Sequence, residues 1–147
     1  IADDIDGYAD LKASCRTPIS GGEHEYTLFG FRQLLEKKAV DVVQFDTNRV
    51  GGITQAHKIC ALAEAFQIPV IPHAGQVHNF HISMSSINAP IVEYFPFWPV
   101  EIGNELFWYI FDGEPQAKNG FVELDESKYG LGIELSKKYL DSFDVTE

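Results

Sequence analysis

Short extended segments alternate with helix-like segments through the first two thirds of the chain, and this alternation limits the fold more than any other feature. The predicted strands, several of them rich in Val and Ile, end at Glu23, Asp46, His73 and Glu93. The segments between them carry apolar residues at helical spacing. Such alternation is typical of parallel α/β sheets, and the near-continuous apolar strands indicate a sheet that is covered on both faces.

The spacing of the strand ends indicates part of a barrel. They are 23, 27 and 20 residues apart, whereas a closed eight-unit barrel takes about 250 residues, or roughly 31 per unit. The 147 residues therefore hold about four units, and they open on a predicted helix at 5–11 with no strand pattern before it. We predict an α/β fold, the C-terminal half of a (β/α)-barrel over residues 1–100, with upstream units missing.

The last third of the chain has a different pattern. An aromatic run at 106–111 is followed by two predicted short strands, 120–124 and 130–135, and by a short helix from Ser136. We predict that residues 101–147 form a C-terminal extension that packs on the barrel or on a capping domain.

The charge balance argues against two classes of partner. Lys and Arg total 11 against 22 Asp and Glu, a net charge of −11, which disfavours nucleic acids and anionic membrane surfaces. No stretch approaches the roughly 20 apolar residues of a membrane helix, and no leader pattern opens the chain. Cys15 and Cys60 lie too far apart for a disulfide framework, so we expect reduced thiols in a cytoplasmic protein.

The four strand-end residues suit one kind of chemistry, because the carboxyl ends of parallel strands converge in space. His73 can move a proton near neutral pH, and Asp46 can orient its ring. Glu23 can bind a hard cation such as Mg²⁺, and Glu93 can donate a hydrogen bond if burial keeps it protonated. Together they suit proton abstraction next to a carboxylate. For any one residue, the alternative is an ordinary polar residue at the start of a loop.

Ordered motifs cover essentially the whole chain. They are GEHEY at 22–26 with FGFR at 29–32, VQFD at 43–46 with GGIT at 51–54, IPHAG at 71–75, NAPIVEY at 88–94 and GLGIEL at 130–135. In this order they resemble the last part of the enolase superfamily barrel, in the mandelate racemase subgroup. The run at 23–26 most resembles acid-sugar dehydratases, above all the L-rhamnonate dehydratases, with the L-fuconate dehydratases as near neighbours.

The resemblance implies a lyase that dehydrates a sugar acid. Glu23 would bind the essential Mg²⁺, and His73, paired with Asp46, would remove the proton next to the substrate carboxylate. Glu93 and Mg²⁺ would stabilise the enediolate, and loss of the 3-hydroxyl would give a 2-keto-3-deoxy acid.

The resemblance also implies parts that the 147 residues lack. These are two further carboxylate ligands for the metal, the first barrel strands and a capping domain. We therefore expect the chain to be inactive alone, and to form a homo-oligomer or be completed by missing N-terminal residues.

The hypothesis includes two further site residues, and two other functions stay open as alternatives to it. His24 and Arg49 are candidate substrate contacts. A zinc-dependent barrel hydrolase is one alternative, although His73, His78 and His81, spaced by five and three residues, match no known ligand set on one helix. The other alternative is a catalytically empty fragment that serves only as a folding or assembly module.

Overall fold

The computed structural model describes residues 3–96 and 109–142. By its internal contacts the chain divides into two units, Ile1–Glu93 and Tyr94–Glu147. The boundary predicted between residues 100 and 101 and most of the aromatic run at 106–111 lie outside the described residues, so the domain assignment stays a prediction. No helix within the described ranges has the length and apolarity needed to cross a bilayer.

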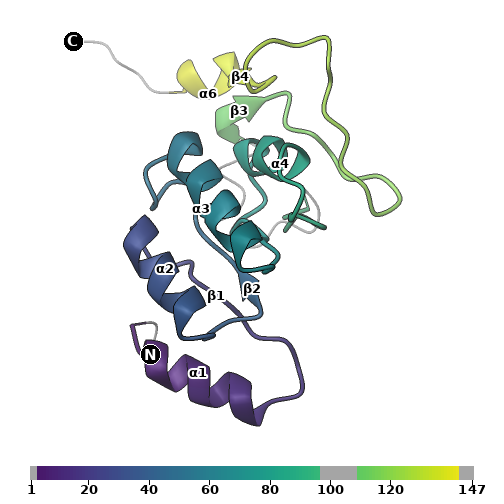
Figure 1. The fold of residues 1–147 in the computed structure, drawn as a ribbon. Coiled ribbons are helices and arrows are strands. Elements are labelled where there is room, and N and C mark those ends of the chain that lie inside the picture. The colour runs from purple at the N-terminus through teal and green to yellow at the C-terminus, as the bar shows by residue number, and fades with distance from the viewer. Residues whose placement is uncertain (1–2, 97–108, 143–147) are drawn as a thin grey trace, which may run out of the picture. The chain divides into compact units, whose positions relative to one another are not determined.

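The first unit alternates helices with very short strands, as predicted (Figure 1). Its elements are α1 (Ile5–Ser14), β1 (Ser20–Gly21), α2 (Leu28–Glu36), β2 (Val42–Val43), α3 (Ile53–Ala65) and α4 (Val77–Met84). The strands are parallel: Ser20 lies opposite Val42 in the β1–β2 pair, and Val43 forms a parallel bridge with Val70. The predicted parallel α/β arrangement is confirmed for these segments.

Main-chain hydrogen bonds extend the parallel pairing toward the carboxyl ends of the strands. The N–H of Ile71 donates to Val43 O at 2.9 Å, and the N–H of His73 donates to Phe45 O at 2.8 Å. On the other side of β2, the N–H of Gln44 donates to Gly21 O at 2.9 Å. Three segments therefore run side by side up to Gly21, Phe45 and His73.

The strand predicted at 91–92 is wrong, since the structure has no strand within the described residues 85–96. The N–H of Val70 donates to Asn88 O at 2.9 Å, which joins this segment to the sheet before the predicted strand begins. Pro90 then has no N–H to offer a ladder. A β-branched pair such as Ile91 and Val92 forms a strand only where a neighbouring chain supplies hydrogen-bond partners.

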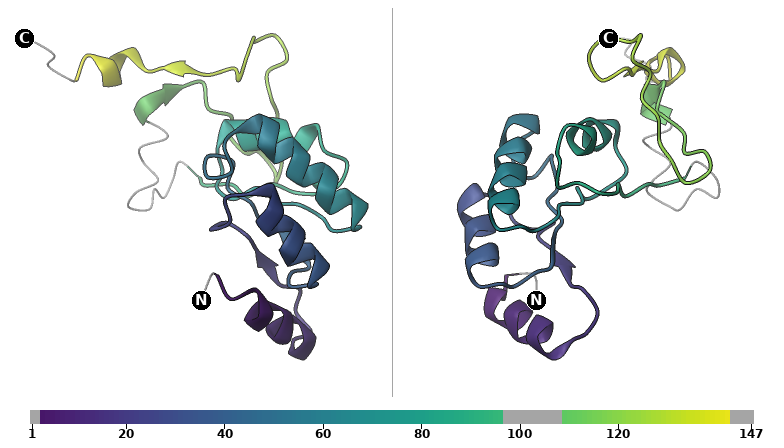
Figure 2. Two further views of the ribbon diagram at one scale, coloured as in Figure 1. Left: turned by 60° about the vertical axis from the view of Figure 1, so that its left-hand side comes forward. Right: turned by 45° about the vertical axis from the view of Figure 1, so that its right-hand side comes forward.

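Local signals mark where three of the helices begin. The Asp4 side chain accepts from the N–H of Gly7 at 2.8 Å and begins α1, and Thr27 caps α2 in the same way through Gly30. Gly51 and Gly52 both have φ of +94°, a left-handed conformation that favours glycine, and α3 begins directly after them. Figure 2 and Figure 1 show α2 and α3 side by side, and the two helices are in contact.

The core lies between these helices and the strands. Its largest fully buried side chains include Phe31 on α2, Phe45 after β2, Ile59 on α3 and Val70. The rings of Phe31 and Phe45 pack edge to face with centroids 6.4 Å apart. Because Phe45 directly precedes Asp46, this packing also determines where the β2 strand end lies.

The structure confirms only part of the stripe that helical spacing predicts over 77–87, which consists of Val77, Phe80, His81, Met84 and Ile87. Val77 and Phe80 are buried, whereas Met84, the last residue of α4, is 55% exposed and Ile87, beyond the helix, is 89% exposed. The buried residues of the helix are Val77, Asn79, Phe80, Ile82 and Ser83. Contacts with α3 and the strand-end loops decide which face is covered, and the residue pattern of α4 alone does not contain that information.

The second unit contains a small antiparallel pair. β3 (Phe111–Asp112) pairs with β4 (Glu134–Leu135), and α6 (Lys137–Leu140) follows directly. The strand predicted at 130–135 is reduced to its last two residues, which form β4, and α6 agrees with the helix predicted from Ser136. The strand predicted at 120–124 is reduced to a bridge between Lys118 and Phe121.

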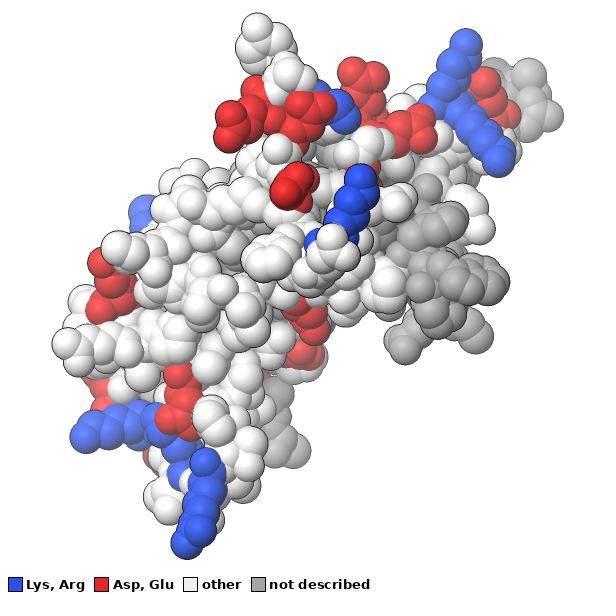
Figure 3. Space-filling view, turned by 90° about the vertical axis from the view of Figure 1, so that its right-hand side faces the viewer, with Lys and Arg blue, Asp and Glu red and all other residues white. Residues whose placement is uncertain are grey.

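The surface charges are scattered. On the face of the described residues drawn in Figure 3, Lys and Arg side chains form no continuous patch and lie among acidic groups. This distribution is in keeping with the excess of acidic residues in the sequence.

Truncation of Phe31 should show how strongly the core supports the site. We expect Phe31→Ala to lower the free energy of unfolding by about 3–5 kcal/mol, because a large side chain is lost from a fully packed site. The matched control on the same helix is Phe29→Ala: Phe29 is 68% exposed, and its loss should cost less than about 0.5 kcal/mol. Urea unfolding measures both, and equal losses would contradict the core assignment.

Glu114 should make the stability of the second unit depend on pH. Burial raises the pKa of Glu114 from 4.5 to about 7. Its contribution to stability is therefore fully present below pH 4.5 and is lost as the pH rises through 7. Glu114→Gln should unfold at higher urea than the wild type at pH 8 and at similar urea at pH 4.5. The exposed Glu123→Gln should show no such difference, and a pH-independent Glu114→Gln effect would refute the assignment.

Candidate active site

Three predicted site residues meet where the parallel segments end. Glu23 follows β1 by two residues, Asp46 follows β2 by three, and His73 ends the segment that pairs with β2. His73 Nδ1 lies 2.9 Å from Asp46 Oδ2, and His73 Nε2 lies 3.2 Å from Glu23 Oε2. The structure therefore places the imidazole of His73 between two carboxylates.

Asp46 is held firmly as an anion. Its Oδ1 accepts from the backbone N–H groups of Asn48 at 2.9 Å and Arg49 at 3.0 Å, while Oδ2 faces His73. Burial by itself raises the pKa of Asp46, but the hydrogen bonds from His73, Arg49 and Asn48, with the charge of His73, outweigh burial and lower it. The carboxylate is therefore ionised at neutral pH and serves as a fixed acceptor for one nitrogen of the ring.

The orientation of His73 follows from that acceptor. With a proton on Nδ1 directed at Asp46, the ring turns Nε2 toward Glu23. The side chain of His73 is 28% exposed, so the ring is partly open to solvent. In the neutral ring with its proton on Nδ1, Nε2 carries no proton and can accept one, and a proton taken up there lies within hydrogen-bond distance of Glu23. The ring is thus placed to take up a proton on Nε2 and to pass it to a nearby group.

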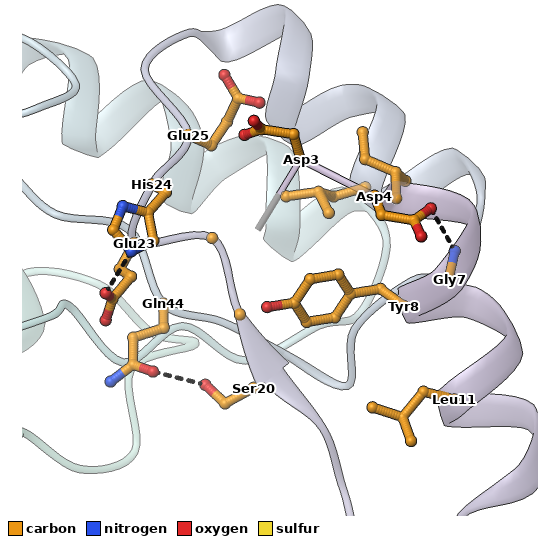
Figure 4. A pocket seen from close by; sticks show the side chains of 14 residues that line it. Asp3, Asp4, Gly7, Tyr8, Leu11, Ser20, Glu23, His24, Glu25 and Gln44 are labelled. Carbon is orange, nitrogen blue, oxygen red and sulfur yellow. Dashed lines mark hydrogen bonds and ion pairs between the residues drawn. The ribbon is translucent and has the colours of Figure 1, made fainter. Parts of the chain in front are cut away.

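Arg49 and His24 extend the cluster on the side of Glu23. Arg49 Nη1 lies 2.7 Å from His24 Nδ1, and a guanidinium can only donate. His24 Nδ1 must therefore accept, which leaves the proton on Nε2, 2.9 Å from Glu23 Oε1. Figure 4 shows the contact between His24 and Glu23. The structure brings both predicted substrate-binding residues to the cluster.

Glu93 reaches the same region from the last segment of the unit. Its Oε2 accepts from the backbone N–H of Ala74 at 2.6 Å. Glu93 therefore lies against the residue that follows His73, and its second carboxylate oxygen is not used in this contact. All four strand-end residues and both accessory residues are brought into one neighbourhood; their chemical roles stay predictions.

A cavity of about 750 Å³ lies beside this cluster, between α1 and β1 (Figure 4). Its lining includes Tyr8, Ser20, Glu23, His24 and Glu25. Neither Asp46 nor His73 lines it. The cavity thus opens on the Glu23 side of the cluster, and the dyad of Asp46 and His73 lies outside it.

The described residues do not assemble a complete metal site. Within ranges 3–96 and 109–142, no group of three or more His, Cys, Asp or Glu side chains is arranged to hold a metal ion. Glu23 offers one carboxylate, and both of its oxygens contact histidine nitrogens. Because Mg²⁺ requires near-octahedral oxygen ligation, this part of the chain alone does not fit the ion.

The structure gives no support to a zinc centre among the described residues. His78 and His81 do not join His73 in a ligand group. His78 Nε2 is buried without a hydrogen-bond partner, and burial lowers the pKa of His78 although the charge of Asp46 opposes this.

Sequence reasoning missed two polar residues behind the site. Thr47 and Asn79 are both buried, and the hydroxyl of Thr47 donates to Asn79 Oδ1 at 2.6 Å. The available signal was an asparagine between two apolar residues that lie at helical spacing, Val77 and Phe80, together with a threonine directly after a candidate site residue.

Comparison with known proteins identifies the family of this chain. Residues 1–139 match the sequence family described as "Enolase C-terminal domain-like". An L-rhamnonate dehydratase of Saccharopolyspora erythraea is 36% identical over 140 residues, which cover 92% of this chain and 35% of that protein. The chain spans about a third of the length of the curated relatives it matches.

Solved structures confirm the predicted barrel fold. L-rhamnonate dehydratase from Gibberella zeae has a TM-score of 0.80 at 32% identity, over 99% of this chain and 40% of that chain. L-talarate/galactarate dehydratase from Salmonella typhimurium LT2, liganded with Mg and L-lyxarohydroxamate, has a TM-score of 0.83 at 30% identity, over 96% of this chain and 34% of that chain. The resemblance seen in the motifs is thereby confirmed, and the chain belongs to the enolase C-terminal domain-like family.

Proposed function

We propose that this chain supplies the proton-transfer part of the active site of an acid-sugar dehydratase, with an L-rhamnonate-like sugar acid as substrate. The observation that carries the proposal is the placement of His73 between Asp46 and Glu23, with Nδ1 toward the first and Nε2 toward the second. The names of the relatives support the substrate class.

In the proposed reaction, His73 acts as base and then as acid. Its Nε2 takes the proton from the carbon next to the substrate carboxylate, and the C–H electron pair moves into an enediolate. The C–O bond at carbon 3 then breaks, and the departing hydroxide leaves as water with the proton from Nε2. The enol product tautomerises to a 2-keto-3-deoxy acid. Asp46 keeps the ring oriented and stabilises its protonated form.

The remaining cluster residues would contact the substrate. We assign to Glu93 a hydrogen bond to the enediolate through the oxygen that Ala74 does not use. Arg49 and His24 are exposed and would bind polar groups of the sugar acid, the guanidinium providing the positive charge that a carboxylate needs.

We further propose that the enzyme depends on Mg²⁺, as its relatives solved with Mg suggest. Glu23 would be one ligand, and the others would come from residues beyond those described. When bound, the ion would stabilise the negative charge of the enediolate.

Completion of the site therefore depends on further protein. We propose that upstream residues or a second copy of the chain supply the remaining barrel strands, the metal ligands and the cap over the substrate. The unpaired thiols of Cys15 and Cys60 fit a cytoplasmic enzyme.

Replacement of His73 tests the proposed chemistry directly. In the full-length protein that contains this chain, His73→Asn should lower kcat for sugar-acid dehydration by about 10²–10⁴-fold, because the proton acceptor is lost. His57→Asn, at an exposed position on α3, is the control and should leave kcat unchanged. Formation of 2-keto acid and exchange of the substrate α-proton in D₂O are the measurements. Undiminished turnover by His73→Asn would disprove the role.

Magnesium titration tests whether Glu23 is one ligand of a metal site that other residues complete. The 147-residue chain alone should bind Mg²⁺ weakly or not at all in isothermal titration, because its described residues, 3–96 and 109–142, assemble no full ligand set. The full-length protein should lose activity with EDTA and regain it with Mg²⁺. Glu23→Gln should raise the Mg²⁺ concentration for half-maximal activity, whereas the exposed Glu64→Gln should not. Tight binding by the bare chain would show that Glu23 is not one ligand of an incomplete set.

A further inference from the structure

Asn79 connects two loops of the candidate site from behind. It lies on α4, is 2% exposed, and comes from a part of the sequence 32 residues beyond Thr47. Its Nδ2 donates to the backbone carbonyls of His73 and Ala74, both at 2.7 Å. These two carbonyls belong to the loop that carries the proposed base.

Thr47 connects the amide of Asn79 to the other loop, the one that begins at Asp46. It directly follows Asp46, is buried, and donates its hydroxyl hydrogen to Asn79 Oδ1 at 2.6 Å. The amide thus uses both hydrogens of its nitrogen and accepts with its oxygen, and the two carbonyl partners determine which end is nitrogen. A buried side chain with all its groups satisfied holds its neighbours in one arrangement.

The loop after His73 needs such restraint. Ala74 has φ of +69°, a left-handed conformation that is unfavourable for a residue with a Cβ and persists only where the surroundings enforce it. The carbonyls of His73 and Ala74 are held by Asn79, and the N–H of Ala74 is held by Glu93. The backbone that carries the imidazole of His73 is therefore restrained by hydrogen bonds to Asn79 and to Glu93.

We propose that Asn79 and Thr47 form a clamp that positions His73 against Asp46. The hydrogen bonds of the two side chains go to each other and to the backbone of His73 and Ala74 and not to the imidazole, so both are positioning residues. The clamp joins the loop that begins at Asp46 to the loop that begins at His73, and it thereby sets the 2.9 Å separation of Nδ1 and Oδ2. Its effect on catalysis rests on the proposed function; its effect on the loop does not.

Kinetics of matched variants test the catalytic consequence in the full-length protein. Asn79→Ser and Thr47→Val should lower kcat by about 10–100-fold with KM within about twofold of the wild type, because a small displacement of the base slows proton transfer more than it weakens binding. Thr47→Ser keeps the hydroxyl donor and should restore most of kcat.

Asn88 provides the matched structural control. Its Nδ2 also donates to two backbone carbonyls, those of Cys60 and Ile68, both at 3.1 Å, at the opposite end of the strand from the site. Asn88→Ser should lower the melting temperature comparably and leave kcat within about threefold. Equal kcat in Asn79→Ser, Thr47→Val and Asn88→Ser would overturn the positioning role.

Hydrogen exchange tests the clamp independently of activity. Amide exchange measured by mass spectrometry should be at least about tenfold faster over residues 73–79 in Asn79→Ser and Thr47→Val than in the wild type, with no such change in Asn88→Ser. Unchanged exchange in this segment would overturn the clamp. If the wild type dehydrates no sugar acid, the proposed function fails while the exchange result still decides the clamp.

Discussion

Parallel main-chain pairing is the constraint on which the rest of this structure depends. β2 has β1 on one side and the segment through Val70 on the other, so hydrogen bonds between neighbouring segments bring their carboxyl ends to the same level. Residues that follow those ends must then meet, although 23 and 27 residues separate Glu23, Asp46 and His73 in the sequence. The contacts of His73 with Asp46 and Glu23 result from this alignment, and the packing of Phe45 beneath it keeps the alignment rigid.

Hydrogen bonds determine the ionisation, the orientation or the tautomer of individual side chains in the site. The backbone N–H groups of Asn48 and Arg49 keep the Asp46 carboxylate ionised, and the carboxylate determines which nitrogen of His73 faces outward. On the other side, the guanidinium of Arg49 determines the tautomer of His24. Arg49 thus contributes its backbone to one carboxylate and its side chain to the neighbourhood of the other, Glu23. A residue with both contacts links the two halves of the cluster.

Short-range signals account for where several of the helices begin. The Asp4 cap, the Thr27 cap and the glycine pair at 51–52 act within a few residues and do not depend on distant parts of the chain. The errors have a common cause. Ile91 and Val92 have strand-forming side chains but no ladder partner, and Ile87 is apolar but no neighbour covers it. Pairing and burial depend on segments elsewhere in the chain, and a local pattern cannot supply them.

The amino-acid sequence by itself determined the alternation of helices and strands up to His73 and the three residue types that follow the parallel segments, Glu23, Asp46 and His73, because periodicity and capping act over one or two turns of chain. It also carried the motifs that indicated the family. Only the tertiary structure decided how those residues are used: which His73 nitrogen meets Asp46, how His24 is protonated, and that Asn79 joins the loops of Asp46 and His73. These features depend on distances of about 3 Å between segments far apart in sequence, where a small displacement breaks a hydrogen bond.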